Sequence, residues 1–171
     1  MIEVVVSRLG LDSSTQSYVV ILQEKDGQRL LPIWIGQPEA ESIAMQMHNV
    51  KRPRPLTHDL CKSLIVGLGG ALEKVHISRV EKNTYYAELH IAKNGSVVQV
   101  DARPSDSIAI ALRLAAPIFA SDALLSEVQI EESSDTTPDF GAAQAEAELN
   151  AEQLKEYLER LRPEDFGKFN L

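Results

Sequence analysis

The chain has 171 residues, enough for one domain with a sizeable core and a short appendage. Its hydrophobic content of 44% and charged content of 25% are ordinary for a globular protein, so the composition excludes wholesale disorder. The net charge of -8 lies at the end of the chain, because residues 1–126 carry 13 basic and 13 acidic side chains whereas residues 127–171 carry 4 and 12. The sequence therefore predicts a neutral body with an acidic tail.

The first part of the chain has the pattern of three strands followed by a helix. Asp26-Gly27 between apolar segments is a strong hairpin signal. Segment 31–35 is almost entirely apolar, which predicts a strand covered on both faces, with Pro32 where its missing N–H is harmless. Pro38 is typical of the first turn of a helix. The expected strands are residues 2–9, 17–24 and 29–35.

A second unit of the same kind follows a loop and an inserted helix. The loop 49–55 is basic and rich in proline, and the expected helix 56–68 ends at a run of glycines. The hairpin turn of the second unit is Asn94-Gly95, and its helix opens at Pro104. The expected elements are strands 73–80, 84–92 and 96–101 and a helix over 104–115.

The two units match each other in sequence. Val4–Leu9 corresponds to Val75–Val80, the Asp-Gly turn to the Asn-Gly turn, and Glu41–Met47 to Asp106–Leu112. The spacing between matching residues shrinks along the chain, so only the connections differ in length. We therefore predict an α+β domain built from two β-hairpin-helix repeats with an inserted helix.

The character of the chain changes after residue 128. Residues 131–140 lack apolar periodicity and are typical of a linker. Segment 141–162 has the Ala/Glu/Leu composition of a helix with a narrow apolar stripe. The predicted organisation is a domain over 1–130, a linker over 131–140 and an acidic C-terminal helical tail over 141–171.

The single cysteine, Cys61, excludes an internal disulfide and a CxxC site. It lies in an apolar helical stretch, so we expect a small buried core residue. The N-terminus enters a strand pattern directly, and no apolar run approaches membrane-spanning length. We therefore expect a cytoplasmic protein that does not enter a membrane.

The clearest chemical signal is the junction between the last predicted strand and its helix. Asp101, Arg103 and Asp106 gather there, and the first unit has Gly, Pro and Glu at the matching positions. Strand ends and helix starts of this kind often host ligands. The alternative is structural, because acids in a first helical turn complement the helix dipole and Arg103 could pair with Asp101.

A second cluster surrounds the start of the inserted helix. Thr57 can cap that helix, and His58 and Lys62 lie four residues apart on one face. The functional interpretation is a phosphate-binding patch with a histidine that can transfer a proton near neutral pH. The structural alternative is a surface histidine in a first helical turn. The cluster consists of Arg52, Arg54, Thr57, His58, Asp59 and Lys62.

Carboxylates beside an arginine and a histidine are the ingredients of phosphodiester hydrolysis, in which acids hold Mg²⁺ or Mn²⁺. The candidate acids are Asp101, Asp106, Glu39 and Glu41. His48, His76 and His90 show no ligand spacing, so the sequence does not predict a structural zinc site. It also lacks a P-loop, a dinucleotide fingerprint and a G-x-S-x-G elbow.

Three segments follow one another along the chain: Leu31-Pro-Ile-Trp-Ile-Gly with Glu39-Ala40, then Arg54-Pro-Leu-Thr-His-Asp-Leu60, and then Val100-Asp-Ala-Arg-Pro-Ser-Asp-Ser-Ile-Ala109. In this order they resemble the hallmark segments of the bifunctional nuclease domain family. The resemblance covers roughly residues 1–130 and implies an α+β domain with a curved mixed β-sheet. It also implies a homo-oligomer, with a dimer favoured, and a nuclease acting on RNA and DNA. The matching motif residues are Glu39, Thr57, His58, Asp59, Asp101, Arg103, Ser105 and Asp106.

The leading hypothesis is a metal-assisted nuclease without strong sequence specificity. Asp101 and Asp106 would hold the metal, Arg103 would bind phosphate and His58 would act as general acid or base. Glu39 and Asp59 complete the expected catalytic set, and the expected nucleic-acid contacts are Arg52, Arg54, Lys62 and Arg103. The rival hypothesis is a non-enzymatic oligomeric module that binds an acidic ligand or a protein, favoured by the neutral body.

Overall fold

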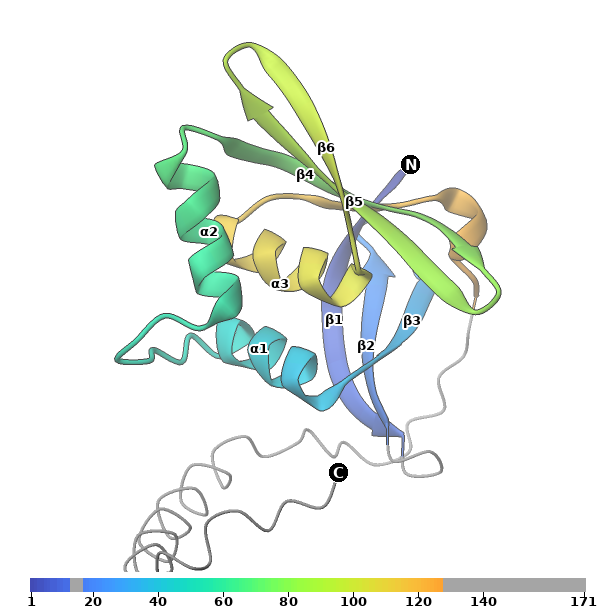
Figure 1. Cartoon of the computed structure of the whole chain (residues 1–171). Helices are drawn as coiled ribbons and strands as arrows, with labels where there is room; N and C mark the ends of the chain where they lie inside the picture. The colour runs from blue at the N-terminus through green and yellow to red at the C-terminus, as the bar shows by residue number, and fades with distance from the viewer. Residues whose placement is uncertain (13–16, 128–171) are drawn as a thin grey trace, which may run out of the picture. The chain divides into compact units, whose positions relative to one another are not determined.

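The computed structural model of the chain describes residues 1–12 and 17–127 (Figure 1). In this part of the chain, three helices pack against an open seven-stranded sheet with the strand order β3-β2-β1-β7-β4-β5-β6. The mixed α+β class predicted from the sequence is confirmed. The linker predicted over 131–140 and the acidic helical tail predicted over 141–171 lie outside the described residues.

The first half of the domain is an antiparallel three-stranded meander followed by a helix. Its third strand is an edge of the sheet, so Pro32 can turn its nitrogen to the unpaired side. Leu31 and Ile33 are buried but Trp34 is 54% exposed, so the expectation of a strand covered on both faces is wrong. The elements are β1 (Ile2–Asp12), β2 (Ser17–Glu24), β3 (Leu30–Ile35) and α1 (Gln37–Met47).

The second half begins with an inserted helix and then has the same order of elements. Asn94 and Gly95 have φ values of 51° and 76°, as a two-residue type I′ hairpin turn requires, so the predicted turn is confirmed. β1 carries one irregularity in register, at Ser7, and β4 carries two, at Glu73 and Ser78. The elements are α2 (Thr57–Gly67), β4 (Ala71–Glu81), β5 (Thr84–Lys93), β6 (Ser96–Ala102) and α3 (Pro104–Leu114).

The two meanders are joined by a strand that the sequence analysis missed. β7 (Ile118–Ala120) lies between β1 and β4, antiparallel to the first and parallel to the second, which makes the sheet mixed. A three-residue strand is too short to show the alternation by which strands are recognised in a sequence. A short 3₁₀ turn, η1 (Asp122–Leu124), follows it.

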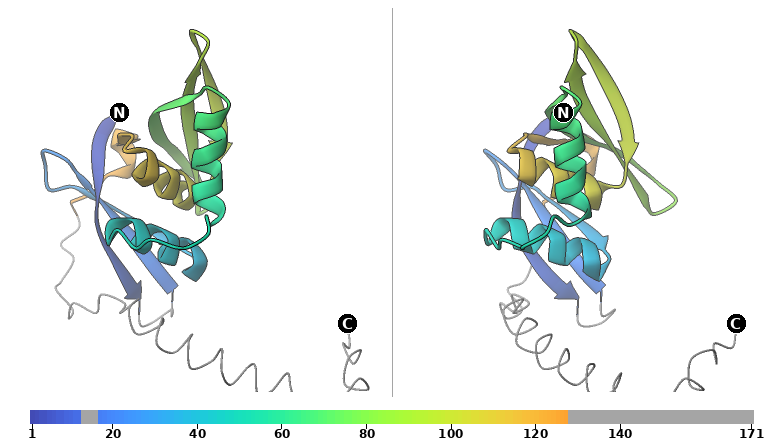
Figure 2. Two further views of the ribbon diagram at one scale, coloured as in Figure 1. Left: turned by 90° about the vertical axis from the view of Figure 1, so that its left-hand side faces the viewer. Right: turned by 60° about the vertical axis from the view of Figure 1, so that its left-hand side comes forward.

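α3 lies at the centre of the helical layer (Figure 2). It contacts α1 and α2 and packs on β4 and β5, whereas α1 packs on β2. Ile108, Ala109 and Ala111 of α3 are completely buried, and the small alanines let the helices approach closely. α2 is peripheral and has no fully buried residue, so Cys61 is partly exposed rather than the core residue expected. None of the described helices is long and apolar enough to cross a membrane.

Candidate active site

An open pocket of about 880 Å³ lies where the N-terminal parts of all three helices meet the basic loop that precedes α2. Pro38 and Pro104 lie in the first turns of α1 and α3, where their fixed φ suits the start of a helix. The exposed N–H groups and dipoles at helix N-termini favour anions. The polar lining residues are Glu39, Glu41, Ser42, Arg52, Arg54, Thr57, His58, Arg103 and Asp106.

A chain of hydrogen bonds crosses this pocket through His58, whose side chain is only 13% exposed. The Nδ1 atom of His58 lies 2.8 Å from Ser42 Oγ, and its Nε2 atom lies 3.0 Å from Asp106 Oδ1. The Ser42, His58 and Asp106 side chains come from α1, α2 and α3 respectively. The fold therefore joins residues from three separate segments into one serine–imidazole–carboxylate line.

Asp106 is held as an anion. Partial burial alone would raise the pKa of Asp106, but hydrogen bonds from Arg103 and His58 outweigh it and keep that pKa below its usual value. Because ionised Asp106 can only accept, His58 carries its proton on Nε2 and donates it to Asp106. When the imidazole is neutral, the hydroxyl of Ser42 donates to Nδ1. The lone pair with which His58 can act as a base is thus directed at Ser42.

Arg103 links the two acidic side chains of the pocket. Its Nε and Nη2 atoms donate to Asp106 at 2.8 and 3.0 Å, and Nη2 also lies 2.8 Å from Glu39 Oε1. These two carboxylates raise the pKa of the Arg103 guanidinium, so it is permanently charged. The Arg103 side chain is nevertheless 65% exposed, so part of it remains available to a phosphate.

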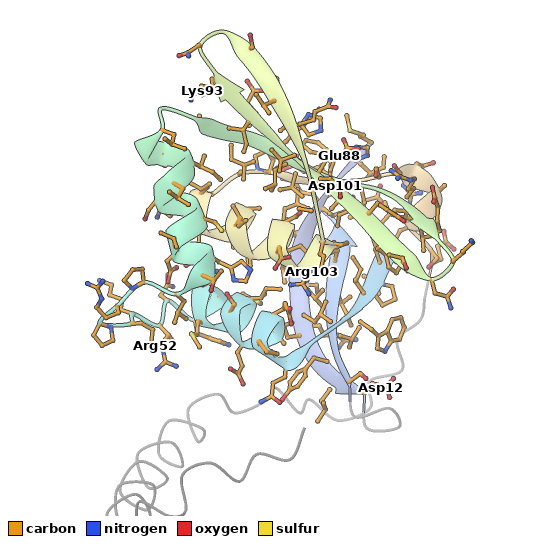
Figure 3. The ribbon with its side chains drawn as sticks, in the orientation of Figure 1. Asp12, Arg52, Glu88, Lys93, Asp101 and Arg103 are labelled. Carbon is orange, nitrogen blue, oxygen red and sulfur yellow. The ribbon has the colours of Figure 1, made fainter. Side chains whose placement is uncertain are left out.

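The structure brings six of the predicted site residues together and separates three. Glu39, His58, Arg103 and Asp106 form the network, and Arg52 and Arg54 lie on the loop beside it, with Arg52 on the outer part of that loop (Figure 3). The separated residues, which are not among the described residues lining the pocket, are Asp59, Lys62 and Asp101.

Asp59 has a structural environment. Its Oδ1 accepts a hydrogen bond of 2.6 Å from Nε of Arg113 in α3, and its Oδ2 accepts one of 2.9 Å from the Leu56 backbone at the start of α2. Partial burial opposes ionisation of Asp59, but these hydrogen bonds prevail and lower its pKa. Arg113 also donates to the Ala109 carbonyl and is 4% exposed at its side chain. Asp59 therefore ties α2 to α3.

Asp101 lies in β6 opposite Glu88 of β5 rather than beside Asp106. Both oxygens of Asp106 are already occupied, one by His58 and Arg103 and the other by Arg103. The pocket therefore does not offer the Asp101–Asp106 pair that the sequence suggested for Mg²⁺ or Mn²⁺. Arg103 is also not paired with Asp101, the alternative weighed from the sequence, but with Asp106 and Glu39.

Sequence reasoning missed Ser42. It lies in the first half of α1, is almost fully buried and carries no motif of its own. Its role becomes visible only when α1 and α2 are packed together, because the bond to His58 spans 16 residues of sequence.

Glu39, residues 54–58, Arg103 and Asp106 of the pocket lie in the three segments whose order suggested a family. The family model described as "Bifunctional nuclease domain" matches residues 20–133, a span that contains every residue of the pocket. The chain belongs to the bifunctional nuclease domain family. The catalytic residues are not given by that match, so their roles rest on the geometry described above.

Three relatives show how far the similarity extends. An uncharacterized protein of Mycobacterium tuberculosis is 40% identical over 164 residues, which cover 96% of this chain and 97% of that protein. Bifunctional nuclease 1 of Oryza sativa subsp. japonica is 31% identical over 64% of this chain, and bifunctional nuclease 2 of Arabidopsis thaliana is 32% identical over 58%. The aligned part is only 34% and 31% of those two plant proteins.

Proposed function

We propose that this protein is a nuclease that cleaves phosphodiester bonds of RNA and DNA without strong sequence specificity in the pocket between the three helix N-termini. The observation that carries the proposal is the Ser42–His58–Asp106 line with Arg103 attached to it. The names of the plant relatives support the reaction class.

Nucleic acid would be held through its phosphates. Arg103, Arg52 and Arg54 supply positive charge around the pocket, and the helix N-termini add partial positive charge. Contacts to phosphate position a nucleic acid but do not read its bases. A pocket built from these groups would therefore accept RNA and DNA of many sequences.

The proton transfers follow from the tautomer of His58. Ser42 passes its hydroxyl proton to Nδ1 and takes one from a water molecule, and the resulting hydroxide attacks phosphorus. Asp106 stabilises the imidazolium, and Arg103 stabilises the negative charge of the five-coordinate phosphorus. The P–O bond to the leaving oxygen breaks, and that oxygen takes the proton back from the imidazolium. These steps use only side chains and water; Mg²⁺ or Mn²⁺ would be held by the pocket carboxylates Glu39, Glu41 and Asp106 and would supply further stabilisation of negative charge.

Replacing Arg103 by Gln is expected to lower cleavage of single-stranded RNA and DNA by about 10–100-fold, because Gln keeps the polarity but loses the charge that binds phosphate. The measurement is the initial rate on end-labelled oligonucleotides with full-length protein. Arg79→Gln is the matched control, since Arg79 pairs with Glu81 on β4 outside the pocket. Equal rates for Arg103→Gln and wild type would contradict the proposal.

The second candidate function is an anion-binding module without turnover. It is favoured by one observation: both nitrogens of His58 and both oxygens of Asp106 already have protein partners. In that case wild type and Arg103→Gln would show the same residual cleavage, and only wild type would bind a non-cleavable oligonucleotide. A cleavage rate that falls with the Arg103 substitution excludes this candidate.

We also propose that two copies of the chain associate through α2 and the edge strand β6. Four leucines spaced four residues apart along α2 are unusually exposed to solvent: Leu56 at 38%, Leu60 at 51%, Leu64 at 52% and Leu68 at 65%. β6 is an edge of the sheet with exposed valines, so its unpaired side can receive a strand of a second copy. Such an apolar surface on a monomer marks an interaction site.

Leu60→Asp with Leu64→Asp is therefore expected to convert a dimer to a monomer, because two charges in an apolar interface cannot be solvated. Light scattering after size-exclusion chromatography measures the mass. Val80→Asp, an exposed valine at the end of β4, is the control and should stay dimeric. A wild-type mass of one chain, or an unchanged mass of the double variant, would refute this interface.

A further inference from the structure

A cluster of two imidazoles and a carboxylate lies on the sheet, outside the pocket. His76 of β4 is the cross-strand partner of Glu88 of β5, and His90 follows Glu88 by two positions, so the three side chains share one face. One ligand atom from each residue lies within 4.8 Å of the other two. The sequence analysis did not predict this cluster, because it depends on strand register rather than on spacing along the chain.

His90 has a buried ring nitrogen that a metal ion could satisfy. It is 9% exposed, and its Nε2 atom is buried without a hydrogen-bond partner among the described residues. That atom lies 3.5 Å from Glu88 Oε2, which is long for a hydrogen bond. Two ligands of a tetrahedral zinc ion, each about 2.0–2.1 Å from the metal, lie roughly 3.3 Å apart. The gap between His90 and Glu88 therefore has the size that one ion bridges.

His76 is held in the form that binds a metal. Ser121 Oγ donates to the Ser78 carbonyl at 2.6 Å, so it must accept from His76 Nε2 at 3.1 Å. The remaining ring nitrogen, Nδ1, then keeps its lone pair. A ligating histidine typically donates its other N–H to an oxygen in this way.

The neighbouring strand adds negative charge. Asp101 of β6 is the cross-strand partner of Glu88, and Figure 3 shows the two labelled side by side on the sheet. Like charges directly opposite each other destabilise a strand pair, so a cation between or beside them would relieve the repulsion. Asp101 therefore offsets part of the positive charge that Lys74 and the N-terminal amine bring close to His76.

We propose that His76, Glu88 and His90 bind one zinc-class divalent transition-metal ion and thereby fasten β4 to β5. Imidazole nitrogens with a carboxylate suit Zn²⁺ and similar ions, whereas Mg²⁺ and Ca²⁺ prefer oxygen ligands. Three protein ligands leave a fourth position for water. This site is separate from the proposed nuclease pocket and does not depend on it.

The test is titration of chelator-treated, full-length protein with ZnCl₂ in competition with a chromogenic chelator. Wild type should bind one Zn²⁺ per chain, and Glu88→Gln or His90→Gln should weaken the affinity at least about 100-fold. Zn²⁺ should also raise the Tm of wild type but not of these variants. His48→Gln is the matched control, because His48 is an exposed histidine at the end of α1 and should bind as wild type does.

Two results would overturn the proposal: wild type without stoichiometric Zn²⁺ binding, or Glu88→Gln with wild-type affinity. Glu88 is partly exposed, so this variant can be measured even if the buried His90→Gln variant fails to fold. His58→Asn should bind Zn²⁺ normally whether or not it cleaves nucleic acid, so a failure of the nuclease proposal is distinguishable from a failure of the metal site.

Discussion

His58→Asn is expected to lower the rate of RNA and DNA cleavage by about 10²–10⁴-fold, the usual contribution of a general acid or base. Asn can still hydrogen-bond to Ser42 or Asp106, so the pocket keeps its shape, but it cannot accept the proton that Nδ1 of His58 takes. The loss should appear in kcat rather than in binding, because the substitution leaves Arg52, Arg54 and Arg103 in place. Initial rates on labelled oligonucleotides over a range of substrate concentrations measure both.

His48→Asn is the control for this experiment, since it removes a histidine that does not line the pocket. Circular dichroism and Tm should be unchanged in both variants. A contaminating nuclease would cleave equally in all preparations, so only a loss that follows the His58 substitution supports the proposal. Unchanged kcat in His58→Asn would show that His58 takes no part in catalysis.

Asp59→Ala is expected to lower the free energy of unfolding by about 3 kcal/mol, because it leaves the buried Arg113 guanidinium without its carboxylate. The start of α2 also loses the acceptor for the Leu56 N–H. Urea denaturation measures the change, and Asp26→Ala in the exposed β2–β3 turn is the control. Full stability combined with lost cleavage would instead give Asp59 the catalytic role expected from the sequence.

The pH dependence of this stabilisation has a definite sign. The pKa of Asp59 is lower in the folded protein than its ordinary value of 3.8, so the folded state favours the ionised carboxylate. The stabilising contribution of Asp59 is fully present when the pH is above its ordinary pKa. It is lost as the pH falls through the lower pKa that Asp59 has in the folded protein. The stability difference between wild type and Asp59→Ala should therefore be constant near neutral pH and shrink in acid.

Local signals predicted most of the secondary structure. The Asn94-Gly95 turn and the prolines that start α1 and α3 determine the backbone conformation by their own chemistry, so they can be read without tertiary context. β7 has no such signal, although it makes the sheet mixed. The matching order of elements and the irregularities at Ser7 and Ser78 are what a duplication would leave, and the internal repeat stays a prediction.

The candidate site was only partly predictable, and Asp101 shows why. Asp101 and Asp106 are close in sequence, but strand alternation decides where Asp101 lies. Val100 and Ala102 pair with the buried Leu89 and Ala87, so Asp101 faces the other side of the sheet with Glu88. Asp106 comes after the strand has ended and belongs to the first turn of α3. Short separation in the sequence therefore did not mean a shared site.

The most direct test of the proposed active site compares two substitutions of the same kind, Asp106→Asn and Asp101→Asn, in one cleavage assay. Asp106 accepts a hydrogen bond from His58, which determines its tautomer, and another from Arg103. Asp101, in contrast, is not among the described residues that line the pocket. We predict that Asp106→Asn loses at least about 100-fold in kcat and that Asp101→Asn cleaves as wild type does. Normal cleavage by Asp106→Asn, or a loss confined to Asp101→Asn, would contradict the assignment of catalysis to this pocket.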